Sequence, residues 1–271
     1  MKRIIATLSL CISLLTFSVA PAAIVYDSLG FEGFAVGALA GQSGGSPSLT
    51  WNNAANAAVA TVQSAIVKDG TRAAALPGNG DRWVGPIVDY TPLASETVLV
   101  EVDIRRSIGI LPSDASEQYS IDIYSSFNSD HTIAFGLFND GGTLHPVVYT
   151  RYNTGTQAFD PSQAPADFVF SGVNLQPNTW VSFRAELNYN TKMMDLTVNG
   201  QNLGGAFAIP FADLGAGTFY EADLEAVSAL GTSDVGYYDN YRISTVSAVP
   251  EPGFAGLLTL ACVGLMRRRR K

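Results

Sequence analysis

Residues 181–200 read VSFRAELNYNTKMMDLTVNG, and apolar residues occupy every second position in both halves of this stretch. They are Val181, Phe183, Ala185, Leu187, Met194, Leu196 and Val198. A period of two directs one set of side chains into a core and the other into water, as in half-buried antiparallel strands. Asn190-Thr191-Lys192 would turn the chain between the halves, and Asn199-Gly200 has the chemistry of a type I′ turn. The stretch therefore predicts a β-hairpin followed by a second tight turn.

The same alternation recurs along the rest of the chain. Residues 98–105 and 119–124 alternate apolar and polar side chains, and Asn139-Asp140-Gly141-Gly142 separates further candidate strands at residues 132–138 and 144–152. About a dozen short strands at regular spacing, with no linker or repeat, predict an all-β fold, an antiparallel β-sandwich or barrel. We expect no helix longer than about three turns.

Two structures compete in the alanine-rich stretch at residues 52–67. Its Val, Thr and Ile residues are β-branched and it has no helix cap, so we expect a loop and then a strand from about Ala57. A short helix is the alternative.

Charge and cysteine content narrow the class of protein. Seven of the 16 Lys and Arg residues lie in the two terminal segments, which leaves 9 basic against 23 acidic residues, a net charge of −14, at positions 23–249. Such a surface repels nucleic acid and anionic membranes, so no nucleic-acid partner is expected. The only cysteines, Cys11 and Cys262, lie in the terminal segments, which leaves the domain between them without a disulfide, a zinc-thiolate site or a thiol nucleophile.

The N-terminal segment, residues 1–22, has the three parts of a secretory signal peptide. Lys2 and Arg3 precede an apolar run, and Ala20 and Ala22 supply small residues at the −3 and −1 positions of a cleavage site. We expect export through the Sec machinery and cleavage after Ala22, with Ala23 as the other cleavage position. A retained anchor helix is the alternative. The remaining chain divides into a domain at residues 23–248 and a tail at residues 249–271.

The tail combines a short motif, an apolar run and a basic end. Pro250, Glu251 and Pro252 come first, residues 253–266 carry no charge, and the chain ends in Arg267, Arg268, Arg269, Arg270 and Lys271. About 14 residues of helix span roughly 20 Å, which is short for a hydrocarbon core of ~30 Å. The five cations would stay on the cytoplasmic side by the positive-inside rule. The tail therefore predicts a single short transmembrane helix with the domain outside.

In this tripartite order the tail resembles the PEP-CTERM sorting signal. The resemblance implies an exosortase as partner, a transient inner-membrane anchor, removal of the tail, and transfer to the cell surface or extracellular matrix of a Gram-negative bacterium. The matched residues are Pro250, Glu251 and Pro252. A simple weak tail anchor is the alternative.

A second resemblance covers the domain. Residues 31–42 read FEGFAVGALAGQ, similar to the opening of concanavalin A-like (laminin-G-like) jelly-roll domains of secreted bacterial proteins. Residues 180–200 resemble the paired strands of that family, and residues 239–243, DNYRI, resemble its closing strand. The sequence departs at Gly45, where the family often places Trp, and Trp51 stands in after a short insertion. In related jelly rolls a structural Ca²⁺ often ties the first strand to the last, which implies Glu32 and Asp239 as candidate ligands; an ordinary surface role is the alternative.

Relatives of this fold include β-glucanases that carry a Glu-x-Asp-x-Glu strand motif, with both catalytic carboxylates on one face. Glu101 and Asp103 match its first part, but Arg105 replaces the second Glu, and around Asp122 neither Glu is present. Both segments are interpreted as solvated strand faces, and no catalytic residue is predicted. His131 and His145, the only histidines, are interpreted as residues at loop edges.

Trp51, Trp83 and Tyr152 are candidate residues for stacking on sugar rings, with a role in the core as the alternative. The sequence thus favours a non-catalytic, glycan-binding or structural surface or matrix protein associated with exopolysaccharide. It establishes no cofactor, and Ca²⁺ is the candidate. A secreted polysaccharide hydrolase is the alternative, and a structural matrix protein without a ligand is a third class.

Overall fold

The computed structural model describes residues 22–52, 60–78, 80–107, 117–125, 131–140, 143–149, 168–203, 209–210, 218–228 and 234–247. Apart from one 3₁₀ turn, η1 (Leu29–Phe31), every regular element in these ranges is a strand. The predicted all-β class and the absence of long helices are therefore confirmed for this part of the chain. No helix in the described ranges is long and apolar enough to cross a membrane.

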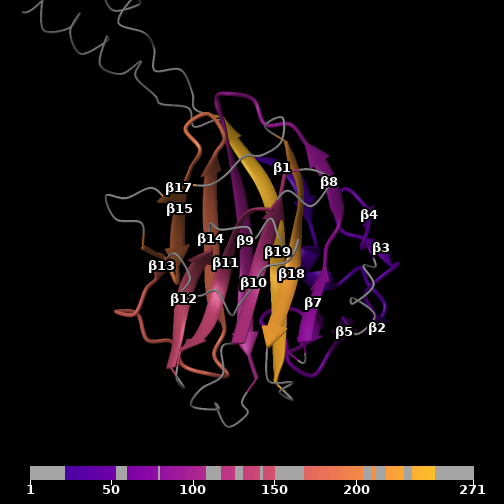
Figure 1. Cartoon of the computed structure of the whole chain (residues 1–271). Coiled ribbons are helices and arrows are strands. Elements are labelled where there is room, and N and C mark those ends of the chain that lie inside the picture. The colour runs from indigo at the N-terminus through magenta and orange to yellow at the C-terminus, as the bar shows by residue number, and fades with distance from the viewer. Residues whose placement is uncertain are drawn as a thin grey trace, which may run out of the picture. The chain divides into compact units, whose positions relative to one another are not determined.

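The larger sheet has ten strands and contains the hairpin on which the fold prediction rests (Figure 1). Its main order is β16-β15-β14-β9-β19-β6-β5-β2, while β1 pairs with β19 and β17 with β15. The strands are β1 (Ala23–Asp27), β2 (Gly37–Ala38), β5 (Thr61–Gln63), β6 (Ala73–Pro77), β9 (Glu96–Arg106), β14 (Val181–Asn188), β15 (Met193–Val198), β16 (Gln201–Asn202), β17 (Ile209–Pro210) and β19 (Val235–Ser247).

The smaller sheet has seven strands in the main order β13-β12-β11-β10-β18-β7, and β8 pairs with β18. Its strands are β7 (Gly80–Val84), β8 (Ile87–Tyr90), β10 (Glu117–Tyr124), β11 (His131–Asp140), β12 (Thr143–Tyr149), β13 (Phe168–Val169) and β18 (Phe219–Ser228). A separate two-stranded ribbon consists of β3 (Ser43–Gly44) and β4 (Leu49–Thr50). Neighbouring strands run antiparallel throughout the pairings described, from β1 with β19 to β5 with β6.

The predicted hairpin forms as β14 and β15. Phe183 pairs with Val198, and burial along β14 alternates strictly between buried and half-buried residues. Asn199 and Gly200 both have positive φ, at 49° and 79°, as a type I′ turn requires, and they lead into β16. The period of two in the sequence therefore fixes which face of β14 reaches the core.

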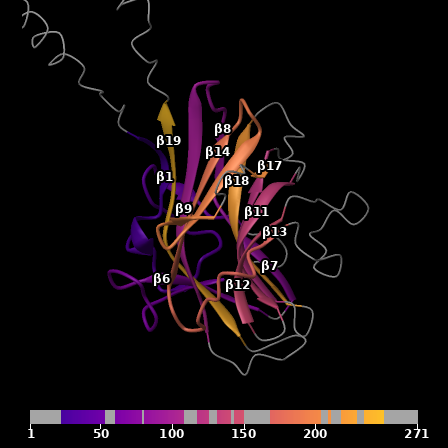
Figure 2. The same ribbon diagram turned by 90° about the vertical axis from the view of Figure 1, so that its left-hand side faces the viewer.

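One apolar core lies between the two large sheets. Val98, Val100 and Val102 from β9 belong to the same buried cluster as Ile121 and Phe135 of the smaller sheet. The rings of Phe135 and Phe183, one from each sheet, lie 6.1 Å apart between centroids. Figure 2 shows the corresponding layers, with β9 and β19 in one and β11 and β12 in the other. Side chains that alternate with these core residues face away from the core on both outer faces of the sandwich.

The opening motif folds around Trp51. Tyr26, Phe31, Phe34 and Tyr241 each place a ring within 6.2 Å of the Trp51 ring, centroid to centroid, and Trp51 Nε1 donates a hydrogen bond of 2.8 Å to Tyr26 Oη. Burying aromatic surface contributes strongly to stability, so this cluster stabilises a region in which β2, β3 and β4 have only two residues each.

Several sequence predictions fall outside the described residues. They concern the signal peptide apart from Ala22, the sorting tail, Ala57 and Tyr152. Within the alanine-rich stretch, the described part contains the short strand β5 and no helix.

Candidate functional site

Glu32 and Asp239, from the opening and closing motifs, both hold the segment at residues 68–72. Glu32 accepts hydrogen bonds from Thr71 N at 2.5 Å, Thr71 Oγ1 at 2.6 Å and Arg72 N at 3.0 Å. The bond from the Thr71 hydroxyl is the main cause that lowers the pKa of the Glu32 carboxyl. Asp239 is fully buried and accepts from Lys68 N at 2.9 Å and Asp69 N at 3.2 Å. The opening and closing motifs therefore contact the same segment of the chain.

The two candidate calcium ligands thus have N–H and O–H donors on their carboxylate oxygens. In the described ranges no group of three or more His, Cys, Asp or Glu side chains is arranged to hold a metal ion. Burial raises the pKa of Asp239 against the opposing effect of its backbone donors. A calcium ion here would have to replace these hydrogen bonds, and its binding stays a prediction.

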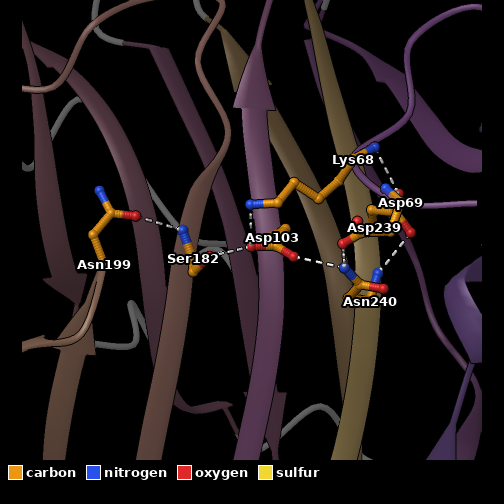
Figure 3. Close-up of polar contacts among 7 residues, drawn as sticks. All are labelled: Lys68, Asp69, Asp103, Ser182, Asn199, Asp239 and Asn240. Atoms are coloured by element: carbon orange, nitrogen blue, oxygen red, sulfur yellow. Dashed lines mark hydrogen bonds and ion pairs between the residues drawn. The ribbon is translucent and has the colours of Figure 1, made fainter.

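Asp239 also begins a polar network that crosses the outer face of the larger sheet (Figure 3). Its neighbour Asn240 donates from Nδ2 to Asp103 Oδ2 at 2.8 Å and to Asp69 Oδ2 at 3.0 Å. Ser182 donates to the other oxygen of Asp103, and Lys68 Nζ lies 3.8 Å from that oxygen. Asp103 is therefore fixed by partners from three different parts of the chain.

This network corrects the interpretation of residues 101–105 as a solvated strand face. Asp103 is only 7% exposed. The alternation in the sequence places Asp103 on the outer face of β9 correctly, but it does not reveal that residues 68–69 and 239–240 pack over that face. A local sequence pattern cannot predict this contact, since Asn240 and Asp103 are 137 residues apart.

A row of carboxyl groups occupies the outer face of the smaller sheet. Glu221, Asp223 and Glu225 follow one another at every second position of β18, while Ala222, Leu224 and Ala226 between them belong to the core. On the neighbouring strand β10, Tyr124, Asp122 and Ser120 lie opposite these three residues in order. Asp122, Asp223 and Glu225 are 1%, 1% and 3% exposed, so three carboxyl groups of this set are removed from water. We call Asp122, Glu221, Asp223 and Glu225 the carboxyl row.

The members of the carboxyl row differ in their hydrogen bonds. Glu225 Oε2 accepts from Ser120 Oγ at 2.9 Å and from Gln118 Nε2 at 3.1 Å, and such donors stabilise a carboxylate. Within the described part of the chain, neither oxygen of Asp223 has a hydrogen-bond partner, although its side chain is buried. A Cβ at Gly85 would lie 1.9 Å from Asp223 Oδ1, so the glycine provides the space for this carboxyl group.

Burial raises the pKa of two members of the carboxyl row, Glu221 and Asp223. Removal from water raises the pKa of Glu221 from its usual 4.5 to about 7. Burial, and then the neighbouring Glu221, Asp122 and Glu225 charges, raise the pKa of Asp223 well above its usual value. Neighbouring groups whose environments give them different pKa values are typical of sites of acid–base chemistry. Purely structural clusters also show such differences.

The carboxyl row contains the complete Glu-x-Asp-x-Glu pattern, which the sequence analysis missed. The pattern is Glu221-Ala222-Asp223-Leu224-Glu225. The prediction that the motif is not intact in this chain was therefore wrong. The interpretation of residues 120–124 as a solvated face was wrong as well, because Asp122 is buried against β18. The alternation in residues 219–226 indicates this strand, but these residues are not among the candidate strands of the sequence analysis.

Tyrosine and apolar side chains continue the same face beyond the row. Ala134, Phe138, Val147 and Tyr149 form a second apolar cluster, with the Phe138 and Tyr149 rings 6.4 Å apart and nearly perpendicular. Burial, followed by the Glu225 and Asp122 charges, raises the pKa of Tyr149 well above its usual value. The face thus places aromatic surface beside hydrogen-bonding groups.

The candidate sugar-stacking residues fall in different places. Trp51 has no exposed surface, so its ring is a core element and offers no face to a sugar, which corrects that prediction. Trp83 lies opposite Glu225 in the pairing of β7 with β18. His145 lies within β12, 6% exposed, rather than at a loop edge, and His131 is the first residue of β11.

Comparison with models of protein families gives no match, and comparison with curated proteins gives none either. Among solved structures, a carbohydrate esterase of the Shiga toxin-encoding bacteriophage phi24B is 11% identical, with a TM-score of 0.49, and the match covers 84% of this chain and 100% of that one. An alginate lyase in complex with alginate tetrasaccharide is 14% identical, with a TM-score of 0.45 and coverage of 86% and 100%. A family 16 carbohydrate-binding module is 11% identical, with a TM-score of 0.32 and coverage of 68% and 84%. These neighbours are carbohydrate-active and carbohydrate-binding proteins, and the likeness is too distant to assign a residue of this chain a role.

Proposed function

We propose that this protein is an exported, glycan-associated protein with a concanavalin A-like sandwich, and that it contacts glycan on the outer face of the smaller sheet. The observation that carries the proposal is the buried Asp223 carboxyl, which has no hydrogen-bond partner in the described structure although it lies in a row of other polar groups. Protonated carboxyl groups both donate and accept hydrogen bonds, as sugar hydroxyls do. Glu221 and Tyr124, which are half-buried, form the end of the row that reaches solvent.

The proposal includes export and surface sorting. The N-terminal segment has the order of a signal peptide, and the C-terminal one has the order of a PEP-CTERM tail. An exosortase would recognise Pro250, Glu251 and Pro252, remove the tail, and release the domain to the surface or to an exopolysaccharide matrix. The acidic domain and its lack of cysteine are compatible with such a location.

Hydrolysis of polysaccharide is the second candidate function, and the complete Glu-x-Asp-x-Glu pattern favours it. A glycosidase needs one carboxylic acid that keeps its proton near neutral pH and one carboxylate. Glu221, with its pKa raised to about 7, suits the acid, and Glu225, which accepts two hydrogen bonds, suits the carboxylate. Asp223 between them would modulate both through its own charge state.

Binding and release assays on the full-length protein separate these functions. We expect retention on insoluble polysaccharides, and loss of that retention in Glu221→Gln. Reducing-sugar release by wild type, abolished in Glu221→Gln and in Glu225→Gln, would make the protein a hydrolase. Retention without release would leave it a binding protein. If the wild-type protein neither binds nor cleaves any polysaccharide of a broad panel, the proposed function is wrong.

A further inference from the structure

A groove of about 790 Å³ crosses the outer face of the larger sheet, next to the Asp103 network. Its lining comes from β1, β9, β14, β15 and β19, and includes Asp27, Glu101, Asp103, Arg184, Thr197 and Arg242. This volume lies within the range of typical ligand sites in proteins. Because the alternating residues of β9 and β14 fill the core, the groove and the carboxyl row lie on opposite outer faces of the sandwich.

Several charged groups in the groove keep free hydrogen-bonding capacity. Within the described residues, Glu101 makes neither a hydrogen bond nor an ion pair, although Arg184 lies opposite it in the β9–β14 pairing. Arg184 instead pairs with Glu186 at 3.1 Å. Among the described residues, Arg242 Nε lies 3.8 Å from Asp27 Oδ2, which is too long for a hydrogen bond, so this donor has no hydrogen-bond partner there.

The Asp103 network, in contrast, forms a rigid wall of the groove, because its polar groups are already bonded to one another. Ser182, Asn240 and Lys68 hold the Asp103 carboxylate, and Asn199 Oδ1 accepts from Ser182 N at 2.9 Å (Figure 3). A site that combines a fixed polar wall with uncommitted charged groups is organised for a ligand before the ligand arrives, which lowers the ordering cost of binding.

Charge and polarity define the class of ligand. Three carboxylates and two guanidinium groups line the groove, so it selects neither a polyanion nor a polycation, and the surrounding domain repels polyanions. Phe183 is 2% exposed and packs against Phe135 in the core, so its ring does not face the groove. Closely spaced acceptors and donors match a chain of hydroxyl groups, which donate to carboxylates and accept from guanidinium groups.

We propose that this groove is a second glycan-binding site, which takes a neutral oligosaccharide on the face opposite the carboxyl row. The proposal rests on the proposed function only in the class of ligand. One protein with sites on two opposite faces would hold two polysaccharide strands at once and cross-link them, with the gain in avidity that bivalency brings.

Titration of the full-length protein with three neutral hexasaccharides, of β-1,4-glucose, β-1,3-glucose and β-1,4-mannose, and with hexagalacturonate tests the groove. We expect binding of at least one neutral hexasaccharide and a loss of affinity of tenfold or more in Glu101→Gln and in Arg242→Gln. Asp195→Asn is the matched control, because Asp195 lies on β15 of the same sheet and outside the groove lining. Its affinity should equal that of wild type, and all variants should melt within about 2 °C of wild type.

Variants of the carboxyl row separate this proposal from the proposed function. If Glu101→Gln and Arg242→Gln weaken binding while Glu221→Gln does not, the groove is a glycan site and the role of the row is wrong. If only Glu221→Gln weakens binding, the row stands and the groove proposal is wrong. Preference for hexagalacturonate, or absence of binding to every neutral hexasaccharide, also overturns the groove proposal. Aggregation of a long neutral polysaccharide by wild type, lost in either class of variant, supports cross-linking by both sites.

Discussion

Asp122 and Asp223 lie directly opposite each other on β10 and β18, and each side chain is only 1% exposed. Two acidic side chains at opposed positions of an antiparallel ladder repel each other when both are ionised. Burial strengthens that repulsion, because the dielectric response of the interior is weak. Two negative charges on this pair are therefore costly, and this cost affects how the protein responds to substitution and to pH.

Asp223→Asn should stabilise the protein at pH 8. The amide has the shape of the carboxyl group but cannot ionise, so it removes the cost of burying a charge, and the repulsion from neighbouring carboxylates, that together raise the pKa of Asp223. We expect the free energy of unfolding to rise by about 1 kcal/mol or more, since a buried uncompensated charge is more costly than that. Urea denaturation of both proteins measures it, with Asp195→Asn, at a half-buried position of β15, as the control. A less stable Asp223→Asn protein at pH 8 would contradict the prediction.

Stability should fall as the pH rises from about 4.5 to 7, because the folded-state pKa of Glu221 is raised to about 7 while the unfolded chain keeps 4.5. Below pH 4.5 Glu221 is protonated in both states and does not change the free energy of unfolding. Above pH 4.5 Glu221 ionises first in the unfolded chain, which lowers the stability of the folded state. The loss of stability is complete once the pH passes the folded-state pKa of Glu221.

The size of this loss is on the order of 2–3 kcal/mol by linkage. Glu221→Gln should flatten the profile between pH 4.5 and 7, and chemical denaturation at a series of pH values measures both proteins. A wild-type profile that rises over this range, or one that Glu221→Gln leaves unchanged, would show that Glu221 is not the responsible group.

Gly136→Ala should destabilise the smaller sheet. A Cβ at this position would lie 2.2 Å from Tyr119 O and 2.6 Å from Ser120 Cα, both backbone atoms of β10 that cannot move independently. We expect a loss of about 3 kcal/mol, at the upper end of overpacking effects. Gly172→Ala is the control, because no atom lies within 4 Å of its added Cβ. Equal melting temperatures for the two variants would refute the tight approach of β10 and β11.

Trp51→Ala should cost about 3–5 kcal/mol, as for other buried aromatic residues. The ring contacts four other aromatic rings, and its Nε1 is bonded to Tyr26 Oη. Trp180, which is half-buried, offers a matched control, and Trp180→Ala should cost much less. If Trp51→Ala left stability unchanged but abolished glycan binding, Trp51 would be a ligand residue after all.

The tail should act through two separable parts. Deletion of Arg267–Lys271 removes five cations that anionic lipid attracts by roughly 1 kcal/mol each, so the protein should slip uncut into the periplasm or medium. Glu251→Ala keeps that stop signal and should leave the protein membrane-held and unprocessed. Fractionation with an antibody to the domain compares the two variants with wild type. Normal processing of both would mean that the tail is not a sorting signal.

The sequence predicts individual strands better than it predicts their neighbours. The alternation at residues 181–198 is sufficient for β14 and β15, because a hairpin joins segments that are adjacent in the chain. The pairing of β10 with β18 joins Ser120 to Glu225 across 105 residues, and no local pattern carries that information. The carboxyl row depends on this pairing, which is why its Asp122 was interpreted as solvated.

The wrong interpretations of Asp103, Asp122 and Trp51 have a related reason. Alternation tells which side chains leave the core, but it does not tell what covers the outer face of a sheet. Asp103 and Asp122 both leave the core as expected, and both are buried by other polar groups. Trp51 shows the opposite error, because an isolated aromatic residue in a loop-like segment packs into the core through partners that lie up to 190 residues away, at Tyr241.

The last described strand of the chain completes the sheet that the first strand begins. Ala23 of β1 pairs with Thr245 of β19, and β19 also separates β9 from β6 within the larger sheet. A chain that emerges from its N-terminus cannot assemble the middle of this sheet before residues 235–247 are present. Such long-range closure is slow and leaves unpaired strand edges exposed meanwhile. The larger sheet of the nascent protein therefore stays incomplete until residues 235–247 are available, and until then its open edges need protection from aggregation.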